Sequence, residues 1–259
     1  MSRKGRSESM FPTSYVGTVP FASTDLNGAA SFVIDSAQKQ VSIPIRLSNA
    51  YCVALAGNDG NYSRLLNGRG VNFPDGTPVV WFMRWRAADG HHAKRVRGPS
   101  LFGEVLSKGR ESSLSHFFLG TDSDTLSKLV QNVSSQYPGV KISGTYDPPF
   151  GPVTESFIEE CVKKIENTDA QIVWVALGTP KQDYVAARLA DRTARPCLGV
   201  GAAFDFHAGT VREAPEWIQR SGMEWVYRLS QDPRRLWKRY LVGNFQFLYH
   251  ATVKSVRSR

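Results

Sequence analysis

Six consecutive apolar residues, Ile172 to Leu177, constrain the fold more than any other segment, and Gly178 follows them directly. A strand that is apolar on both faces belongs in the middle of a parallel sheet whose two sides are covered by helices. The next residues, 180–190, carry apolar side chains at helical spacing, as in a βα unit. The sequence therefore predicts an α/β fold with a Rossmann-like, doubly wound, mostly parallel sheet and ligands at the carboxyl ends of its strands.

The same alternation of strands and helices extends over most of the chain. Further runs typical of strands are 41–48, 79–83, 116–119, 140–143 and 197–200. Helical spacing is found at 25–38, 100–106, 123–136 and 153–167. After residue 211 the strands stop, and helices rich in arginine and aromatic residues are predicted at 215–221, 224–229 and 233–253. We therefore expect a flexible basic tail at 1–14, an α/β domain at 15–211 and a helical, basic C-terminal appendage at 212–259.

Charge and cysteine usage limit the partners and the compartment. The net charge is +9, and residues 217–259 hold nine Lys or Arg against Glu224 and Asp232, which favours phosphate esters, anionic lipid or nucleic acid as partners. The three cysteines form no CxxC pair, which argues against a zinc or redox site and fits a reducing cytoplasm. No secretory signal and no apolar run long enough to span a membrane are found, so we expect any membrane contact to be peripheral.

Two loops have the design of a phosphate-binding turn. Gly120 and Gly178 each follow an apolar strand and are each followed by Thr and then by the start of a helix. Glycine lets a ligand approach the backbone, and a helix N-terminus offers free N–H groups to phosphate. Tight βα turns favour the same residues without a ligand, but two such loops in one sheet favour a nucleotide. A third turn, 199–209, contains Asp205, which either contacts substrate or holds backbone N–H groups.

Carboxylates suggest a catalytic base and, less strongly, a cation site. Asp75 lies in the turn Phe73-Pro74-Asp75-Gly76 before the predicted strand 79–83, where it either serves only the turn or acts as a general base towards a sugar hydroxyl. Asp122-Ser123-Asp124 has the DxD form that can hold a divalent cation, although both acids could simply cap the helix they open. The histidines show no HxxxH or HExxH spacing, so no metal site is predicted from them.

Five ordered blocks in the second half of the chain resemble the WecG/TagA/CpsF glycosyltransferase family of bacterial cell-surface polysaccharide and teichoic acid synthesis. They are Leu177-Gly178-Thr179-Pro180-Lys181-Gln182, Gly199 to Phe206, Ala214-Pro215-Glu216-Trp217, Glu224-Trp225-Val226-Tyr227-Arg228-Leu229, and Asp232-Pro233-Arg234-Arg235-Leu236 with Arg239-Tyr240. The likeness extends upstream to Asn49, Asp75, Arg97-Gly98 and the Gly120 loop. It departs at Leu47, where the family often has Thr, and at Glu213, where it has a basic residue.

This resemblance implies an inverting, metal-independent transfer, without a cofactor, from a UDP-sugar to a sugar on a polyprenyl diphosphate. It implies Asp75 as catalytic base and Asn49 and Gln182 at the donor sugar. Arg97, Gly120, Gly178 and Asp205 match positions on the donor and nucleotide side. Arg228 and Arg235 match arginines that close over the diphosphate. Arg234 and Arg239 are their neighbours, and the resemblance does not separate the roles of these two.

The aromatic and basic C-terminus leaves several interpretations open. Interleaved rings and cations are typical of helices in an anionic lipid headgroup layer, although the same rings could pack on the core. With a lipid-linked acceptor, we expect a cytoplasmic protein that binds peripherally at the inner face of the membrane. The competing hypotheses are a nucleic-acid-binding protein, for which no recognition motif is found, and a cation-dependent transferase using Asp122 and Asp124. A dehydrogenase is disfavoured by the absence of GxGxxG.

Overall fold

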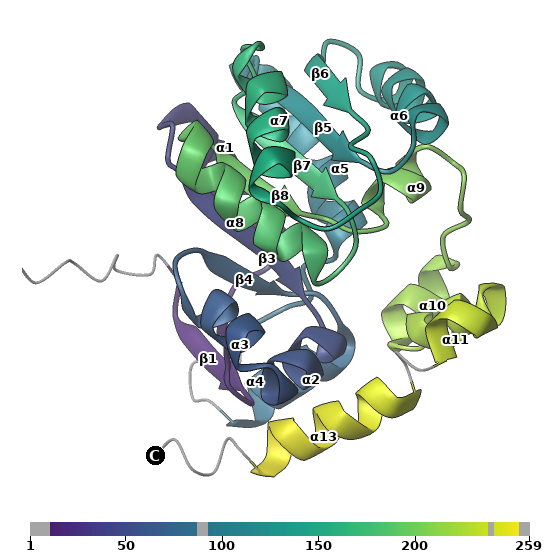
Figure 1. Cartoon of the computed structure of the whole chain (residues 1–259). Helices are drawn as coiled ribbons and strands as arrows, with labels where there is room; N and C mark the ends of the chain where they lie inside the picture. The colour runs from purple at the N-terminus through teal and green to yellow at the C-terminus, as the bar shows by residue number, and fades with distance from the viewer. Residues whose placement is uncertain (1–10, 87–92, 238–240, 254–259) are drawn as a thin grey trace, which may run out of the picture.

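The computed structural model describes residues 11–86, 93–237 and 241–253. At its centre is a sheet of six strands in the order β4-β3-β8-β7-β5-β6, in which every neighbouring pair is parallel. The predicted α/β fold with a parallel sheet and added C-terminal helices is therefore confirmed (Figure 1). The strands are β3 (Ile43–Ser48), β4 (Val71–Pro74), β5 (Ser115–Gly120), β6 (Lys141–Tyr146), β7 (Ile172–Ala176) and β8 (Pro196–Gly199).

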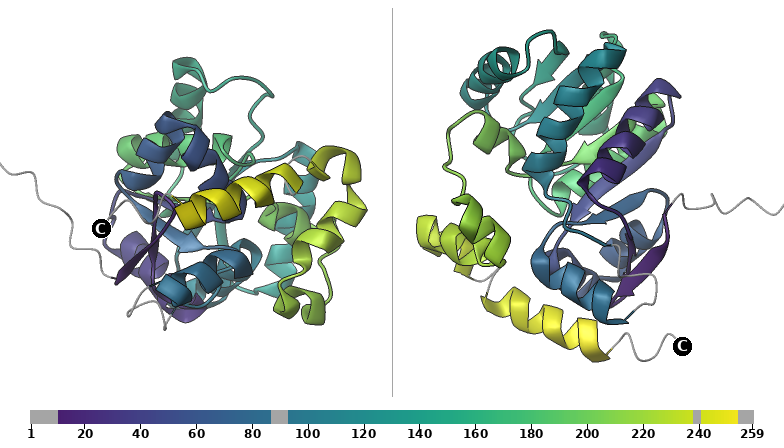
Figure 2. Two further views of the ribbon diagram at one scale, coloured as in Figure 1. Left: turned by 90° about the horizontal axis from the view of Figure 1, so that it is seen from below. Right: turned by 180° about the vertical axis from the view of Figure 1, so that it is seen from behind.

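Helices cover both faces of this sheet, as the apolar strand β7 requires. Ile172 and Trp174 point into a core shared with α1 (Leu26–Gln38), α5 (Gly98–Gly109), α6 (Ser123–Gln136) and α9 (Ala203–His207). Val173 and Val175, on the other face, pack against α7 (Glu155–Glu166) and α8 (Lys181–Thr193). Successive side chains of a strand point to opposite faces, so one apolar run supplies both cores. The two faces are seen in Figure 1 and, from behind, in Figure 2.

A second, smaller core lies below the β3–β4 edge of the sheet. It is built from the antiparallel hairpin of β1 (Thr13–Val16) and β2 (Val19–Ala22) with the helices α2 (Ala50–Asn58), α3 (Gly60–Asn67) and α4 (Thr77–Arg86). The sequence patterns did not predict the hairpin, α2 or α3. These elements are four to nine residues long, too short to show a clear period, and their apolar faces meet only in the folded chain.

One predicted strand is wrong. Residues 79–83 lie inside helix α4, and the strand at this place is β4, which ends immediately before Asp75. A short apolar run fits either a strand or a buried helix face. Val79 and Met83 are fully buried, whereas Trp81 and Trp85 are 60% and 72% exposed, so the spacing of both pairs follows the helical i, i+4 repeat. Asp75 therefore follows the carboxyl end of β4, at the same edge of the sheet where Asn49 follows β3.

The C-terminal helices attach to the rest of the molecule in two places. The short helices α10 (Glu216–Ser221), α11 (Glu224–Gln231) and α12 (Pro233–Trp237) lie beside the carboxyl edge of the sheet (Figure 1). Helix α13 (Gly243–Val253) packs on α2 in the smaller core, so the predicted helix 233–253 corresponds to two helices. In the described part of the chain, no helix is long and apolar enough to cross a membrane.

Candidate active site

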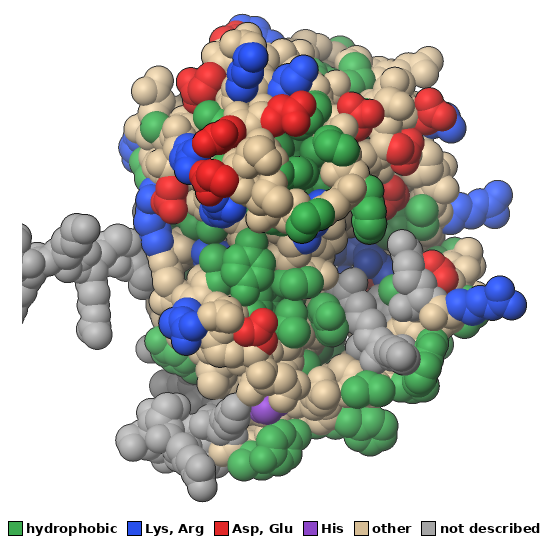
Figure 3. Space-filling model, viewed as in Figure 1, with side chains coloured by type: hydrophobic (Ala, Val, Ile, Leu, Met, Phe, Trp, Pro, Cys, Tyr) green, Lys and Arg blue, Asp and Glu red, His purple; other side chains and the backbone are tan. Residues whose placement is uncertain are grey.

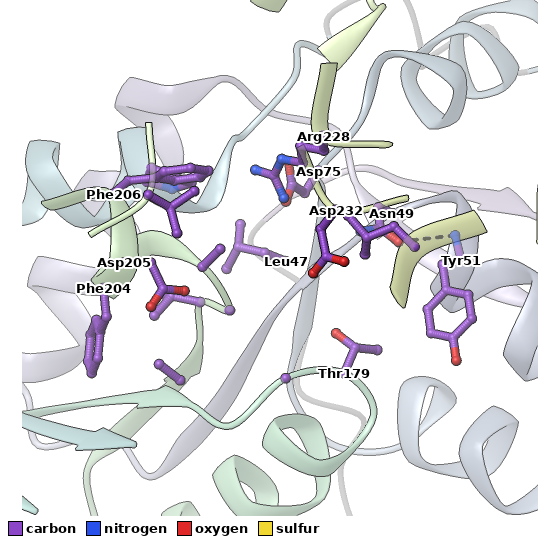
Figure 4. A pocket seen from close by; sticks show the side chains of 18 of the residues that line it. Leu47, Asn49, Tyr51, Asp75, Thr179, Phe204, Asp205, Phe206, Arg228 and Asp232 are labelled. Carbon is purple, nitrogen blue, oxygen red and sulfur yellow. Dashed lines mark hydrogen bonds between the residues drawn. The ribbon is translucent and has the colours of Figure 1, made fainter. Parts of the chain in front are cut away.

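A cavity of about 1070 Å³ opens at the carboxyl edge of the sheet. Loops that follow β3, β4, β7 and β8 form one side of it, and α11 with the start of α13 forms the other (Figure 4). Parallel strands bring their carboxyl ends to one edge, which is why residues far apart in the sequence meet here. Six of the residues singled out from the sequence line it: Asn49, Asp75, Gly178, Gln182, Asp205 and Arg228.

The side-chain amides of Asn49 and Gln182 take part in the lining of this cavity. The Oδ1 of Asn49 caps α2 by accepting hydrogen bonds from the backbone N–H of Tyr51 (3.0 Å) and Cys52 (3.4 Å). The Oε1 of Gln182, a residue only 3% exposed, accepts one from Gly201 N (3.0 Å). With both oxygens engaged, the two NH₂ groups are the parts left for a ligand. Each can donate to a sugar hydroxyl or a phosphate oxygen.

Asp75 is held at the end of β4 by its backbone N–H, which donates to Ser48 O (2.9 Å). Its side chain is 24% exposed, and the Nε of Arg95 lies 3.9 Å from its Oδ1, too far for a hydrogen bond. Burial raises the pKa of this carboxyl; Arg95 opposes the rise, and Glu224 adds to it. Among the described residues, no side chain donates a hydrogen bond to the carboxylate. The carboxyl of Asp75 therefore combines a raised pKa with partial exposure, the two properties that a general base requires.

A second cavity, of about 310 Å³, adjoins the first. Its lining is mainly apolar and comes from α4, α11 and α13, with Trp81, Phe82, Trp225, Phe247 and Leu248 among its residues. Four residues line both cavities: Asn49, Tyr51, Asp75 and Arg228. The carboxylate of Asp75 therefore lies at the junction between the larger cavity, whose lining is about half polar, and the smaller, mainly apolar one. They are called the polar and the apolar cavity below.

Buried charges form the wall behind Asp75. Glu224, at the start of α11, accepts hydrogen bonds from Arg97 (Nη2, 3.0 Å), from Arg95 and from Arg228 (Nη2, 2.9 Å). Burial alone would raise the pKa of Glu224, but Arg97, Arg228 and Arg95 outweigh it and lower that pKa to about 2. Arg97 also donates to Glu213 (2.9 Å). The Arg97 predicted on the donor side thus lies in the wall, 7% exposed, and does not line either cavity.

The other sequence-predicted residues are distributed around the cavity. Gly120 supports the sheet edge, because a Cβ at this position would overlap Ala176 O, and it is Thr121 that lines the cavity. Arg234 is exposed on α12 and does not line the cavity. Arg235 belongs to the same helix, but its side chain and the whole of Arg239 lie outside the described residues.

The DxD segment, Asp122-Ser123-Asp124, lines neither cavity, although its neighbour Thr121 lines the larger one. Asp122 caps α6 by accepting from Thr125 N (2.8 Å) and Thr125 Oγ1 (2.9 Å), and this bonding to Thr125 lowers its pKa. Asp124 is exposed in the first turn of the same helix. Over the residues that the structure describes, no three His, Cys, Asp or Glu side chains gather as metal ligands would. Helix capping therefore accounts for Asp122.

The sequence assigned no individual role to several residues of the site, although Thr179, Phe206 and Asp232 lie in the family blocks. Tyr51, Thr179 and Asp232 line the large cavity, and the Phe206 ring lies under the guanidinium carbons of Arg228 (5.0 Å) and Arg97 (5.5 Å). The Glu224 cluster was missed as well. Its only local signal is the four-residue spacing of Glu224 and Arg228, which favours an ion pair on one helix face.

Comparison with known proteins identifies the family of this chain. Residues 14–259 match the model of the glycosyl transferase WecG/TagA/CpsF family. The chain belongs to this family. A Bacillus subtilis (strain 168) protein, N-acetylglucosaminyldiphosphoundecaprenol N-acetyl-beta-D-mannosaminyltransferase, is 29% identical over 234 residues, 88% of this chain and 87% of the relative. A protein of the same name from Bacillus spizizenii (strain ATCC 23059 / NRRL B-14472 / W23) is 30% identical over 181 residues, 70% and 67% of the two chains.

This WecG/TagA/CpsF family member is a glycosyltransferase. Its match to the family model takes in the loops after the strands, α11 and α13, so the residues of both cavities lie within it. The resemblance described from the sequence is therefore confirmed at the level of the family and of the enzyme class.

Proposed function

We propose that this protein transfers an N-acetylmannosamine-type sugar from a UDP-sugar to the sugar of a polyprenyl-diphosphate-linked acceptor, with inversion and without a metal. The observation that carries this proposal is that Asp75 and Arg228 line both cavities. A donor in the polar cavity and an acceptor in the apolar one would meet at a carboxylate and a guanidinium. These are the two groups that such a transfer needs at its reacting centre.

The proposed step is a single displacement. Asp75 takes the proton from an acceptor hydroxyl as that oxygen bonds to the anomeric carbon of the donor sugar. The bond from this carbon to the diphosphate breaks, and its electron pair leaves with UDP. Attack from the face opposite UDP inverts the anomeric centre. The guanidinium of Arg228 and the NH₂ groups of Asn49 and Gln182 would stabilise the charge on the departing diphosphate.

The apolar cavity suits the lipid-borne part of the acceptor. Its rim includes Trp81 (60% exposed) on α4 and Leu248 (50%) on α13. Phe245 and Tyr249, also on α13, are largely exposed. Figure 3 shows apolar side chains gathered along the edge of the molecule where α13 lies. Exposed aromatic and aliphatic side chains favour contact with a membrane surface, here the inner face, where UDP-sugars are available. In this proposal, 15–211 is the catalytic domain and 212–259 closes the site and meets lipid.

The donor sugar is proposed from the relatives. Both are named for transfer of N-acetyl-beta-D-mannosaminyl groups to N-acetylglucosaminyldiphosphoundecaprenol. Leu47, 6% exposed, lines the donor cavity beside Asn49 and offers no hydrogen bond there. An apolar wall at this point would select among sugars by shape.

A transfer assay tests the proposal. Purified protein is incubated with undecaprenyl-diphosphate-N-acetylglucosamine and, in turn, UDP-N-acetylmannosamine, UDP-N-acetylglucosamine and UDP-glucose, each with EDTA or Mg²⁺. We expect UDP-N-acetylmannosamine to be used best, with equal rates in EDTA. Activity only with Mg²⁺ would favour a cation-dependent enzyme instead. Binding of RNA with no transfer from any donor would favour a nucleic-acid-binding protein.

A further inference from the structure

Asp75 belongs to a cluster of three arginines and three carboxylates. Arg95 and Arg97 come from the segment that follows α4, and Arg228 comes from α11. The carboxylates are Asp75, Glu213 and Glu224. Glu224 is 6% exposed and is the one member that accepts from all three arginines. A buried carboxylate with several charge-assisted bonds fixes the groups around it more tightly than a surface pair does.

Arg95 links this cluster to the proposed base. Its Nη1 donates to Gln219 O (3.0 Å) on α10, and its Nη2 donates to Glu224. Because a guanidinium is planar, these two bonds fix its orientation and turn Nε towards Asp75, 3.9 Å away. That Nε has no hydrogen-bond partner among the described residues. Arg95 therefore acts on Asp75 through charge while leaving the carboxylate oxygens available.

Catalysis would be slower if Arg95 lay either closer to Asp75 or farther from it. A guanidinium in direct contact with a carboxylate would hold its proton affinity low and make it a weak base. A guanidinium turned away would leave a partly buried carboxylate that takes up a proton before it meets the acceptor. We infer that Glu224 is a positioning residue, which holds Arg95 at the distance from Asp75 that keeps this carboxylate both charged and free to accept the acceptor's proton.

Among the described residues, the charged groups with the largest influence on the pKa of Asp75 belong to this arrangement. They are Arg95, Glu224, Arg228 and Arg97, in that order of influence on its pKa. Glu224 acts on Asp75 as a like charge and also restrains the three arginines. Replacing it with Gln removes the like charge and releases Arg95 and Arg97 towards Asp75. Both changes lower the pKa of Asp75, so its protonation would move to lower pH.

The test is the pH dependence of kcat/KM, and it rests on the proposed role of Asp75 as base. For Glu224→Gln, we expect the acid limb to move down by about one pH unit and the plateau to fall, because the base is weaker. Glu224→Asp should return the limb towards the wild-type position. Glu155→Gln is the control, because Glu155 pairs with Arg188 and Arg192 on the surface, away from both cavities. It should leave the profile unchanged.

A double variant tests the route through Arg95. If Glu224 acts through Arg95 as well as by its own charge, Glu224→Gln should shift the acid limb less in the Arg95→Gln background than in the wild type. An equal shift in both backgrounds would overturn that route. Arg95→Lys keeps the positive charge but removes the planar guanidinium that donates to both Gln219 O and Glu224. It should shift the acid limb of the kcat/KM profile even if Glu224→Gln does not fold. An acid limb that disappears in Asp75→Asn but stays in place in the Glu224 and Arg95 variants would overturn the positioning role. An acid limb that persists in Asp75→Asn would instead overturn the proposed base.

Discussion

Helices α11 and α13 belong to the same C-terminal region, but α13 attaches to the rest of the molecule by apolar burial and α11 by ion pairs. Helix α13 buries Phe247 and Ala251 in the smaller core and sets the ring of His250 against Gly57 of α2. Helix α11 attaches through the ion pairs of Glu224 with Arg95 and Arg97. Apolar burial responds little to pH, whereas a buried carboxylate does. The charged attachment is the one that adjoins Asp75, so the stability of α11 and the chemistry of the site are coupled.

The largest effect is expected at Asp75, where the charged wall meets the two cavities. Asp75→Asn keeps the size of the side chain but removes the proposed base. We expect turnover to fall by about 10²–10⁴-fold, the range for loss of general base catalysis. UDP affinity, measured by calorimetry, should stay close to that of the wild type, because the donor side of the cavity is unchanged. Turnover retained at more than one tenth would exclude Asp75 as the base.

The apolar attachment is tested by Phe247→Ala. Phe247 is 2% exposed, and its removal should destabilise the fold by about 3–5 kcal/mol, as for other large-to-small core changes. The measurement is urea unfolding at low and high salt, with the same loss expected in both. Phe245→Ala is the matched control, because its ring is 76% exposed and its loss should cost less than about 0.5 kcal/mol. Equal losses in the two variants would contradict the packing of α13.

The charged attachment should make stability depend on pH. The arginines lower the pKa of Glu224 from an ordinary 4.5 to about 2. Its stabilisation is therefore fully present above pH 4.5 and is lost as the pH falls towards 2, with a total of about 3 kcal/mol. The free energy difference between wild type and Glu224→Gln should shrink over this range, as followed by urea unfolding at several pH values. A difference that does not change with pH would contradict the ion-pair attachment.

A smaller effect is expected at the contact between α2 and α13. A Cβ at position 57 would overlap the His250 ring, so Gly57→Ala should displace α13 and destabilise the protein by about 1–3 kcal/mol. In Gly60→Ala, the new Cβ meets only the end of the Arg64 side chain, at 3.7 Å, and the helix should be unchanged or slightly more stable. Thermal unfolding compares the two. A stabilised Gly57→Ala protein would show that α13 does not rest on this glycine.

The sequence predicts the parts of this molecule whose signals are local. The apolar run at β7 requires cover on both faces, and that requirement gives the layered sheet, its direction and the edge where ligands bind. Five site residues were found because each follows a strand or lies in a family block: Asn49, Asp75, Gly178, Gln182 and Asp205. The carboxyl edge of the sheet brings them together.

Contacts between distant segments were beyond the reach of local signals. The run at 79–83 has the composition of a strand, and only its packing in the smaller core shows that it is a helix. Arg97 and Glu224 are separated by 127 positions, so their pairing leaves no pattern in the sequence. For the same reason Arg97 was expected beside the donor, whereas in the structure it lies in the wall behind Asp75.

The measurement that most directly tests the two-cavity account is the effect of Trp81→Ala on each substrate separately. Trp81 lines the apolar cavity but not the polar one. The account predicts a rise of about tenfold in KM for the lipid-linked acceptor, equal to ~1.4 kcal/mol of lost apolar contact, with the Kd of UDP unchanged. A weakened affinity for UDP with an unaltered acceptor KM would contradict it, because the acceptor would then bind elsewhere.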